Sequence, residues 1–195
     1  MTMKNQITLG TKVVVSDPCY EIPTWCQAIV DGVKPGKYYV HAHKLDIDGW
    51  GERVCALVAI HEDHEFSNIY LDLNPNEIGV DSGQAGIFDF DSYRNDGHIN
   101  LIPRVLEEPF RSWRSENETG CDWYDHVSEY TLSDESWGRY EYGTMSSSGI
   151  GDGSYSLYTA TVDENSPEIV GFVIDFGLDG NIIENLEEML QNENA

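Results

Sequence analysis

The sequence has few basic residues. Its 195 residues include 35 Asp and Glu but only 11 Lys and Arg, so the formal net charge at pH 7 is −24. The imbalance is largest in residues 105–195, where 20 acidic residues meet three arginines. Because proteins bind nucleic acid by neutralising phosphates with Lys and Arg, we expect no direct nucleic-acid binding. The charge favours either a merely solvated acidic face, or cation binding, or contact with a basic surface.

Long apolar runs are also missing. No stretch approaches the roughly 18 consecutive apolar residues of a membrane-spanning helix, and the opening MTMKNQITLG lacks the apolar centre of a signal peptide. We therefore expect a cytoplasmic protein with no membrane partner. The four cysteines, Cys19, Cys26, Cys55 and Cys121, form no C-x-x-C pair, which predicts free, half-buried thiols in a reducing compartment.

The usual signatures of catalysis are absent from the sequence. It contains neither G-x-S-x-G nor H-E-x-x-H. Two histidine pairs, His41 with His43 and His61 with His64, are candidate metal ligands, but a zinc site needs three or four ligands that converge. Surface or half-buried imidazoles are the alternative interpretation. The sequence thus favours a protein that is not an enzyme, and it predicts no cofactor other than a divalent cation as an open alternative.

Strand patterns dominate the remaining sequence. Short segments rich in β-branched and aromatic residues are separated by Gly, Pro, Asn and Asp clusters. The predicted strands are residues 12–16, 37–44, 53–60, 155–162 and 169–176. The last two are expected to be antiparallel neighbours. The pattern predicts a mainly β (α+β) protein, built as a compact antiparallel sheet or sandwich with one or two short helices and a C-terminal helix.

Helical patterns are sparse. Residues 22–30 are predicted as a short helix, and residues 181–195 as a C-terminal helix or tail with one apolar face. Residues 107–137 combine three Trp with many charges and lack a clean period, so we interpret them as an inserted, partly helical region or long loop. The length and the aromatic content predict a single β-rich domain over residues 1–180.

The segment SSSGIGDGSYSLY, residues 146–158, allows two interpretations. Gly149, Gly151 and Gly153 permit positive φ, so consecutive amides can surround an anion. Alternatively, the Asp-Gly pair at 152–153 makes a hairpin turn between a strand ending near Met145 and one beginning at Tyr155. Local pattern alone favours the hairpin.

Several aspartates stand at or near the ends of predicted strands. They are Asp17, Asp81, Asp89, Asp91, Asp152 and Asp175. Loops at one end of a β scaffold bring together groups that are distant in sequence. Such carboxylates would bind Mg²⁺ or Ca²⁺, provide acid–base chemistry, or simply stabilise turns through side-chain hydrogen bonds to the backbone.

The glycine segment, the later strand IVGFVIDF and the earlier VDSGQAGIFD together resemble the bacterial and phage family called domain of unknown function 4241. The opening VSDPCY and GWGERVCALVAIH resemble a phage-associated branch of it. The resemblance spans roughly residues 10–176 and implies a β-rich fold without an established activity. It also suggests that the shared turns form one ligand-binding cleft. The candidate residues are Asp17, Tyr20, Asp81, Ser82, Gln84, Ser148, Gly149, Gly151, Asp152, Gly153 and Tyr155.

Acidity, missing catalytic motifs and the phage-like resemblance lead to one favoured hypothesis. It is a phage- or prophage-type protein of the bacterial cytosol that acts by binding a host protein, including as a counter-defence factor that mimics DNA. The alternative is a nucleotide-binding sponge or metal-dependent hydrolase that takes a small anionic ligand on the Gly-Asp-Gly turn and the clustered aspartates. A structural component of a virion is a third interpretation. The sequence makes no prediction of oligomeric state.

Overall fold

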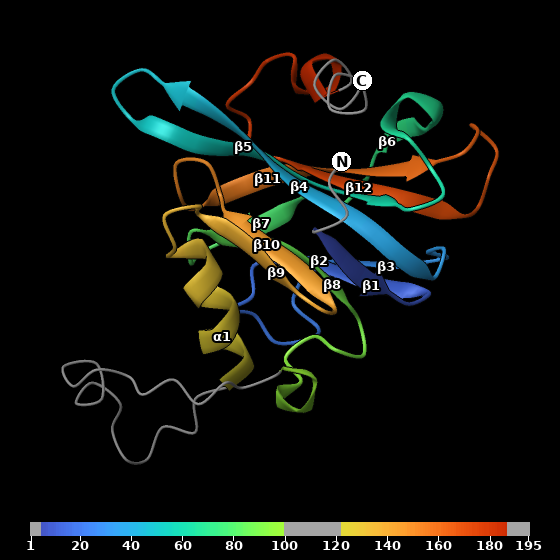
Figure 1. Ribbon diagram of the computed structural model, residues 1–195, viewed down its shortest axis with the longest axis horizontal. Coiled ribbons are helices and arrows are strands. Elements are labelled where there is room, and N and C mark those ends of the chain that lie inside the picture. The colour runs from blue at the N-terminus through green and yellow to red at the C-terminus, as the bar shows by residue number, and fades with distance from the viewer. Residues whose placement is uncertain (1–4, 100–121, 187–195) are drawn as a thin grey trace.

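The computed structural model describes residues 5–99 and 122–186, and these form two antiparallel β-sheets packed face to face (Figure 1). The larger sheet has the strand order β1-β4-β5-β12-β11-β6, and β7 also pairs with β11. Its strands are β1 (Gln6–Leu9), β4 (Gly36–Ile47), β5 (Gly51–His61), β6 (Tyr70–Leu73), β7 (Ile78–Val80), β11 (Gly153–Thr161) and β12 (Ile169–Asp175).

The smaller sheet has the order β3-β2-β8-β10-β9. Its strands are β2 (Lys12–Ser16), β3 (Ala28–Asp31), β8 (Gln84–Asp89), β9 (Trp137–Tyr140) and β10 (Gly143–Ser147). The described helical segments are two 3₁₀ turns (Phe66–Asn68 and Asp96–His98), the helix α1 (Asp122–Thr131) and a turn of helix at residues 182–186. None of the helices in the described ranges has both the length and the apolar character needed to cross a bilayer.

The core between the sheets follows from residue alternation along the strands. Tyr38, Val40 and Ala42 of β4 are buried, as alternate residues of a strand share one face. They belong to one apolar cluster with side chains of the smaller sheet such as Val13 and Ile87. Burial of this shared face holds the two sheets together.

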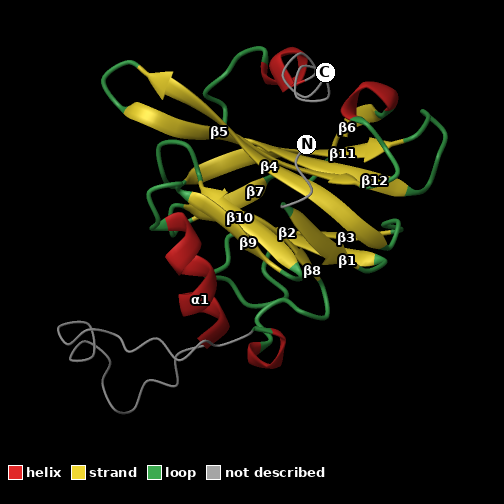
Figure 2. Ribbon diagram, viewed as in Figure 1, coloured by secondary structure: helices red, strands yellow, loops and turns green. Residues whose placement is uncertain are grey.

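Each sheet also carries an apolar cluster on its outer face. Ile182 and Leu186 of the C-terminal helical turn pack in a cluster with Val58 and Val173 of the larger sheet. On the smaller sheet α1 lies against β9 and β10 (Figure 2). Because both faces of the central strands are covered, β5 is buried at every residue from 54 to 61.

The five predicted strands are confirmed, as are the mainly β class, the antiparallel pairing of the last two strands and a helical turn near residue 182. The helix predicted at residues 22–30 is wrong. This segment is a loop followed by β3, because Ile29 and Val30 pair with β2 instead of continuing a helical turn. Of the proposed insertion 107–137, residues 107–121 lie outside the described residues, as do residues 187–195 of the C-terminal prediction.

The hairpin predicted around the glycine segment is also wrong. β10 pairs with β8 and β9 in the smaller sheet, whereas β11 pairs with β12, β6 and β7 on the other side. Residues 148–152 therefore carry the chain from one sheet to the other. The Asp-Gly pair is a local turn signal. β10, however, pairs with the preceding strand β9, and β11 pairs with the following strand β12, so β10 and β11 do not pair with each other.

Candidate functional site

Three chain segments meet at the turn Asp81–Gly83, between β7 and β8. The backbone N–H groups of Asp81 and Ser82 donate hydrogen bonds to Oδ2 of Asp17, at 2.9 and 2.7 Å. The next N–H, of Gly83, donates to Oδ1 of Asp152 at 3.1 Å. Successive N–H groups aimed at negative oxygens form an anion-binding arrangement. Here the anions are the protein's own carboxylates, and we call these five residues the aspartate junction.

Asp17 forms the buried half of the junction. Its side chain has no solvent exposure, and it lies directly after β2. Besides the two amides above, its carboxylate accepts from the N–H of Cys19 at 2.8 Å and from the hydroxyl of Ser82 at 2.6 Å. Four donors occupy both oxygens and compensate the cost of burying a carboxylate. Asp17 therefore ties the smaller sheet to the β7–β8 turn.

Asp81 and Asp152 form the exposed half of the junction. Val80, the last residue of β7, pairs with Gly153, the first residue of β11. Asp81 directly follows Val80 and Asp152 directly precedes Gly153, so the two aspartates stand at facing positions of the two chains. The hydroxyl of Tyr20 donates to Asp81 Oδ2 at 2.7 Å, and this bond raises the pKa of Tyr20 well above its ordinary value. Two like charges at facing positions repel one another, which favours a cationic partner.

The glycine segment closes on itself rather than around an anion. Tyr155 donates its hydroxyl to the carbonyls of Ser148 and Gly151, at 3.0 and 2.6 Å. The hydroxyl of Ser148 also donates to Gly151 O, at 2.8 Å. Gly149 and Gly151 have φ of +60° and +124°, so the sequence needs glycine at both positions. Carbonyl oxygens, not amides, converge on Tyr155, which gives this turn a polarity opposite to that of an anion site.

Gln84 connects the junction to α1. Its carbonyl Oε1 accepts from the hydroxyl of Thr131 at 2.6 Å, and its Nε2 lies 3.3 Å from the hydroxyl of Ser128. The same Nε2 lies 3.4 Å from the hydroxyl of Ser82. Since Gln84 is buried, its role in this structure is to hold the helix to the first residue of β8.

The structure thus brings the predicted candidate residues to one region. Tyr20 bonds to Asp81, and the 81–84 segment bonds to the 148–155 segment through Gly83. Two of the strand-end aspartates, Asp89 and Asp175, stabilise turns elsewhere. Asp89 accepts from the N–H of Gly10 at 2.8 Å, from the hydroxyl of Ser92 at 3.1 Å and from the N–H of Asp91 at 3.2 Å. Asp175 accepts from the N–H of Gly177 at 2.8 Å. For these two carboxylates, turn stabilisation explains the sequence pattern.

Two residues of the region escaped the sequence interpretation. Tyr93 donates its hydroxyl to the carbonyls of Tyr20 and Asp17, at 2.7 and 3.1 Å. Arg94 donates to Pro18 O at 2.8 Å. Both residues support the backbone of the loop that follows β2, from 73 or more residues away in sequence. No local pattern marks such a contact, because any tyrosine or arginine in a loop has the same surroundings in sequence.

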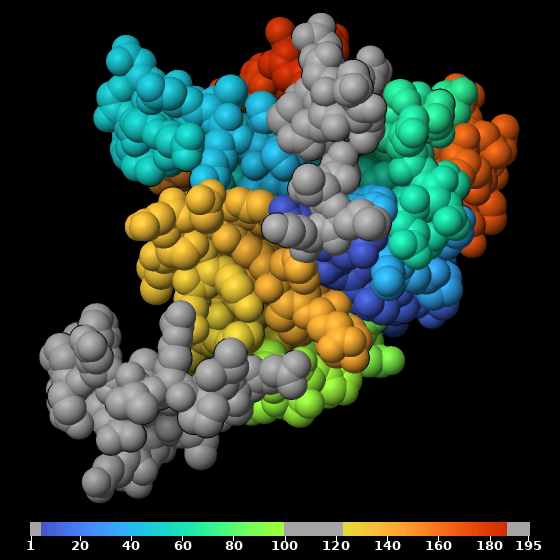
Figure 3. Space-filling view, viewed as in Figure 1, coloured from blue at the N-terminus to red at the C-terminus, as the bar shows by residue number. Residues whose placement is uncertain are grey.

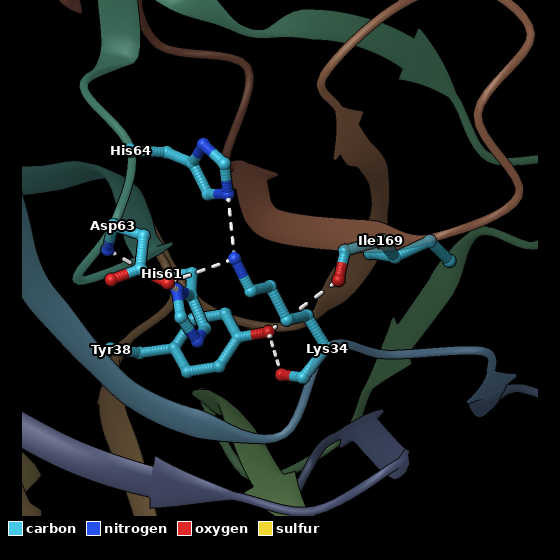
Figure 4. A network of polar contacts seen from close by, with 6 residues as sticks. All are labelled: Lys34, Tyr38, His61, Asp63, His64 and Ile169. Carbon is cyan, nitrogen blue, oxygen red and sulfur yellow. Dashed lines mark hydrogen bonds and ion pairs between the residues drawn. The ribbon is translucent and has the colours of Figure 1, made fainter.

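A second polar cluster contains His61 and His64, whose ring centres lie 5.8 Å apart (Figure 4). The ammonium of Lys34 donates to Asp63 Oδ2 at 2.9 Å and lies 3.2 Å from Nε2 of His64. His61 is 3% exposed, its Nδ1 accepts the N–H of Asp63 at 3.2 Å, and its ring contacts Tyr38 edge-on. Lys34 therefore places a positive charge beside Nε2 of His64, which disfavours a second cation at that nitrogen.

The other histidine pair has different surroundings. The ring of His41 lies 6.4 Å from that of Trp137, and burial lowers the pKa of His43. Over residues 5–99 and 122–186, no three His, Cys, Asp or Glu side chains are grouped as metal ligands. Cys19, Cys26 and Cys55 are free thiols, as predicted, but only Cys19 of these three is half-buried, because Cys26 and Cys55 lie in the interior. Cys121 lies outside the described residues. Burial, with Asp17 adding to it, raises the pKa of Cys19 to about 12, so its thiol is a poor nucleophile.

The stability of the protein is expected to fall on acidification partly through His64. Burial and the charge of Lys34 lower its pKa below 6.5, so between the lowered pKa and 6.5 the unfolded chain binds more protons than the folded one. Stability contributed by neutral His64 is then lost as pH falls through this window. We therefore expect the melting temperature of His64→Gln to fall less than that of the wild type when the pH is lowered from about 7.5 to about 5. Parallel profiles would contradict this assignment.

No family model, curated protein or solved structure matches the chain. The resemblance to domain of unknown function 4241 accordingly stays a prediction. The function of the aspartate junction has to be argued from its own geometry and charge.

Proposed function

We propose that the protein is a non-enzymatic binding protein whose partner presents a basic surface. The observation that carries this proposal is the division of the aspartate junction into a buried and an exposed half. Asp17 is saturated by the protein's own donors, so the inside of the junction is structural. Asp81 and Asp152 are exposed beside each other and present negative charge outward.

The surrounding sequence supports a cationic partner. There is no Lys or Arg in residues 13–33, 54–93 or 140–186, which include the segments that meet at the junction. A surface of one sign attracts a partner of the opposite sign over distances comparable with the Debye length and disfavours partners of like charge. Following the phage-like resemblance, we infer a host protein of the bacterial cytosol as the partner. A DNA-binding groove is the specific form of this proposal.

Binding is expected to weaken steeply with salt. The purified chain would be used to isolate a partner from bacterial lysate, and the purified pair would then be titrated by calorimetry. From about 50 to about 500 mM NaCl we expect the dissociation constant to rise by about tenfold or more, because salt screens the attraction. If the partner is a DNA-binding protein, duplex DNA should compete.

An affinity that does not change with salt would contradict the electrostatic proposal. The alternative function, a sponge or hydrolase for a small anionic ligand, predicts a different result. Native mass spectrometry of the freshly purified chain would then show a bound nucleotide or divalent cation, and Asp81→Asn would remove it.

A further inference from the structure

Trp25 is the most exposed large apolar side chain in the described ranges, with 94% of its surface accessible. It lies in the loop that connects β2 to β3. Single exposed apolar residues are common on protein surfaces and need no explanation by themselves. Trp25 differs because the loop that carries it is fixed on both sides.

Hydrogen bonds hold the residues around Trp25. The N–H of Thr24 donates to Gln27 Oε1 at 2.8 Å, and the hydroxyl of Thr24 donates to Glu21 O at 2.6 Å. The next residue, Cys26, is buried, and its carbonyl accepts the N–H of Gly79 in β7 at 3.0 Å. An indole presented by an already ordered loop loses little backbone entropy on binding. Tryptophan is one of the residue types enriched at binding hot spots.

The loop of Trp25 is joined to the exposed half of the aspartate junction. Tyr20, near the start of the loop, bonds to Asp81, and the carbonyl of Cys26 bonds to the strand that Asp81 follows. Glu77, at the other end of β7, is also exposed. The indole is therefore carried by a loop that is joined to exposed carboxylates. The guanidinium of Arg94 also bonds to this loop, at the carbonyls of Pro18 and Cys19. Among cationic side chains, arginine pairs with carboxylates and also stacks on an aromatic face, which lysine does less well.

Among the described residues, the second most exposed tryptophan has a different setting. Trp50 is 56% exposed at the tip of the β4–β5 hairpin, which projects at the upper left in Figure 3. That hairpin carries its own cations, because Lys44 pairs with Glu52 and Arg53 follows directly. Trp50 is thus a matched control, a partly exposed indole on a part of the surface that is not purely acidic.

We propose that Trp25 is the anchor of an interaction surface for an arginine-bearing protein, with the indole stacking on a guanidinium while Asp81, Asp152 and Glu77 pair with neighbouring charges. This inference rests on the proposed function and names the place and the chemistry of the contact. Exposed arginines on the partner would pair with the carboxylates of this surface and stack on the indole at its centre.

The test uses a short oligo-arginine peptide and an oligo-lysine peptide of equal length, titrated at physiological ionic strength. The wild type should bind the arginine peptide more tightly. We expect Trp25→Ala to weaken binding of the arginine peptide about fivefold, and to reduce the difference in affinity between the arginine and lysine peptides. Trp50→Ala should change the affinity for either peptide by less than about twofold. Circular dichroism would show that both variants remain folded.

The outcomes separate the inference from the proposed function. Salt-sensitive binding that is equal in the wild type and in Trp25→Ala would overturn the Trp25 surface but leave the acidic binding function standing. Equal losses in the two tryptophan variants would also overturn it, since the effect would not be local. If neither peptide binds the wild type, both the surface and the proposed function are wrong.

Discussion

Changing Asp17 to asparagine is expected to lower the free energy of unfolding by about 2–4 kcal/mol. The substituted amide keeps one oxygen for the N–H groups of Asp81 and Ser82 but turns an NH₂ group toward the N–H of Cys19. A buried donor facing another donor loses its hydrogen bond and is not compensated by water. Urea unfolding followed by circular dichroism would measure the change, and Asp17→Ala is expected to be more severe.

Asp152→Asn provides the matched control within the same junction. It removes the same charge, but Asp152 is exposed and accepts a single hydrogen bond, from Gly83, in the described structure. We expect it to cost no more than about 1 kcal/mol. If Asp17→Asn proved as stable as the wild type, the carboxylate would not be a structural tie, and the buried half of the junction would have to be reconsidered as a ligand site.

The strands were predictable from sequence because their signal is local. β-Branched and aromatic residues between Gly, Pro and Asp clusters identify β2, β4, β5, β11 and β12 without knowledge of their partners. Which sheet each strand joins is not local information. The Asp-Gly pair at 152–153 is typical of a hairpin, yet β11 pairs with β12, β6 and β7, and the turn becomes a crossover between sheets.

The site shows the same limit. Asp17 was recognisable as a turn aspartate, since it lies in SDPCY directly after a strand. Its carboxylate accepts a hydrogen bond from the N–H of Ser82, which lies 65 positions away in sequence. No rule based on sequence spacing predicts that contact. The glycine segment contacts the VDSG turn, residues 80–83, through the hydrogen bond from the N–H of Gly83 to Oδ1 of Asp152. The anion-binding amides, however, belong to the VDSG turn, and the glycine segment supplies one of the anions through Asp152.

Trp123→Ala is expected to destabilise the protein by about 3–5 kcal/mol, because it removes the centre of the apolar cluster under α1. Trp123 has no solvent exposure, and its ring lies 5.2 Å from that of Phe88 and 5.0 Å from that of Tyr93. Its indole N–H donates to the hydroxyl of Tyr140 at 3.1 Å. Trp123→Phe keeps a ring but loses this bond, so a smaller loss of about 1–2 kcal/mol is expected.

This prediction decides whether α1 is an accessory or a part of the fold. If the segment that contains Trp123 were a removable insertion, its loss would leave the smaller sheet intact, and Trp123→Ala would resemble Trp25→Ala, which should change stability by less than about 0.5 kcal/mol. The structure argues against that, because without α1 the outer face of β8 and β10 would expose Phe88 and Met145. Thermal unfolding of Trp123→Ala, Trp123→Phe and Trp25→Ala, followed by circular dichroism, would show whether α1 is an accessory or a part of the fold. A large loss of stability for Trp123→Ala alone would show that α1 stabilises the smaller sheet. Strand β8 of that sheet begins at Gln84, which connects α1 to the aspartate junction.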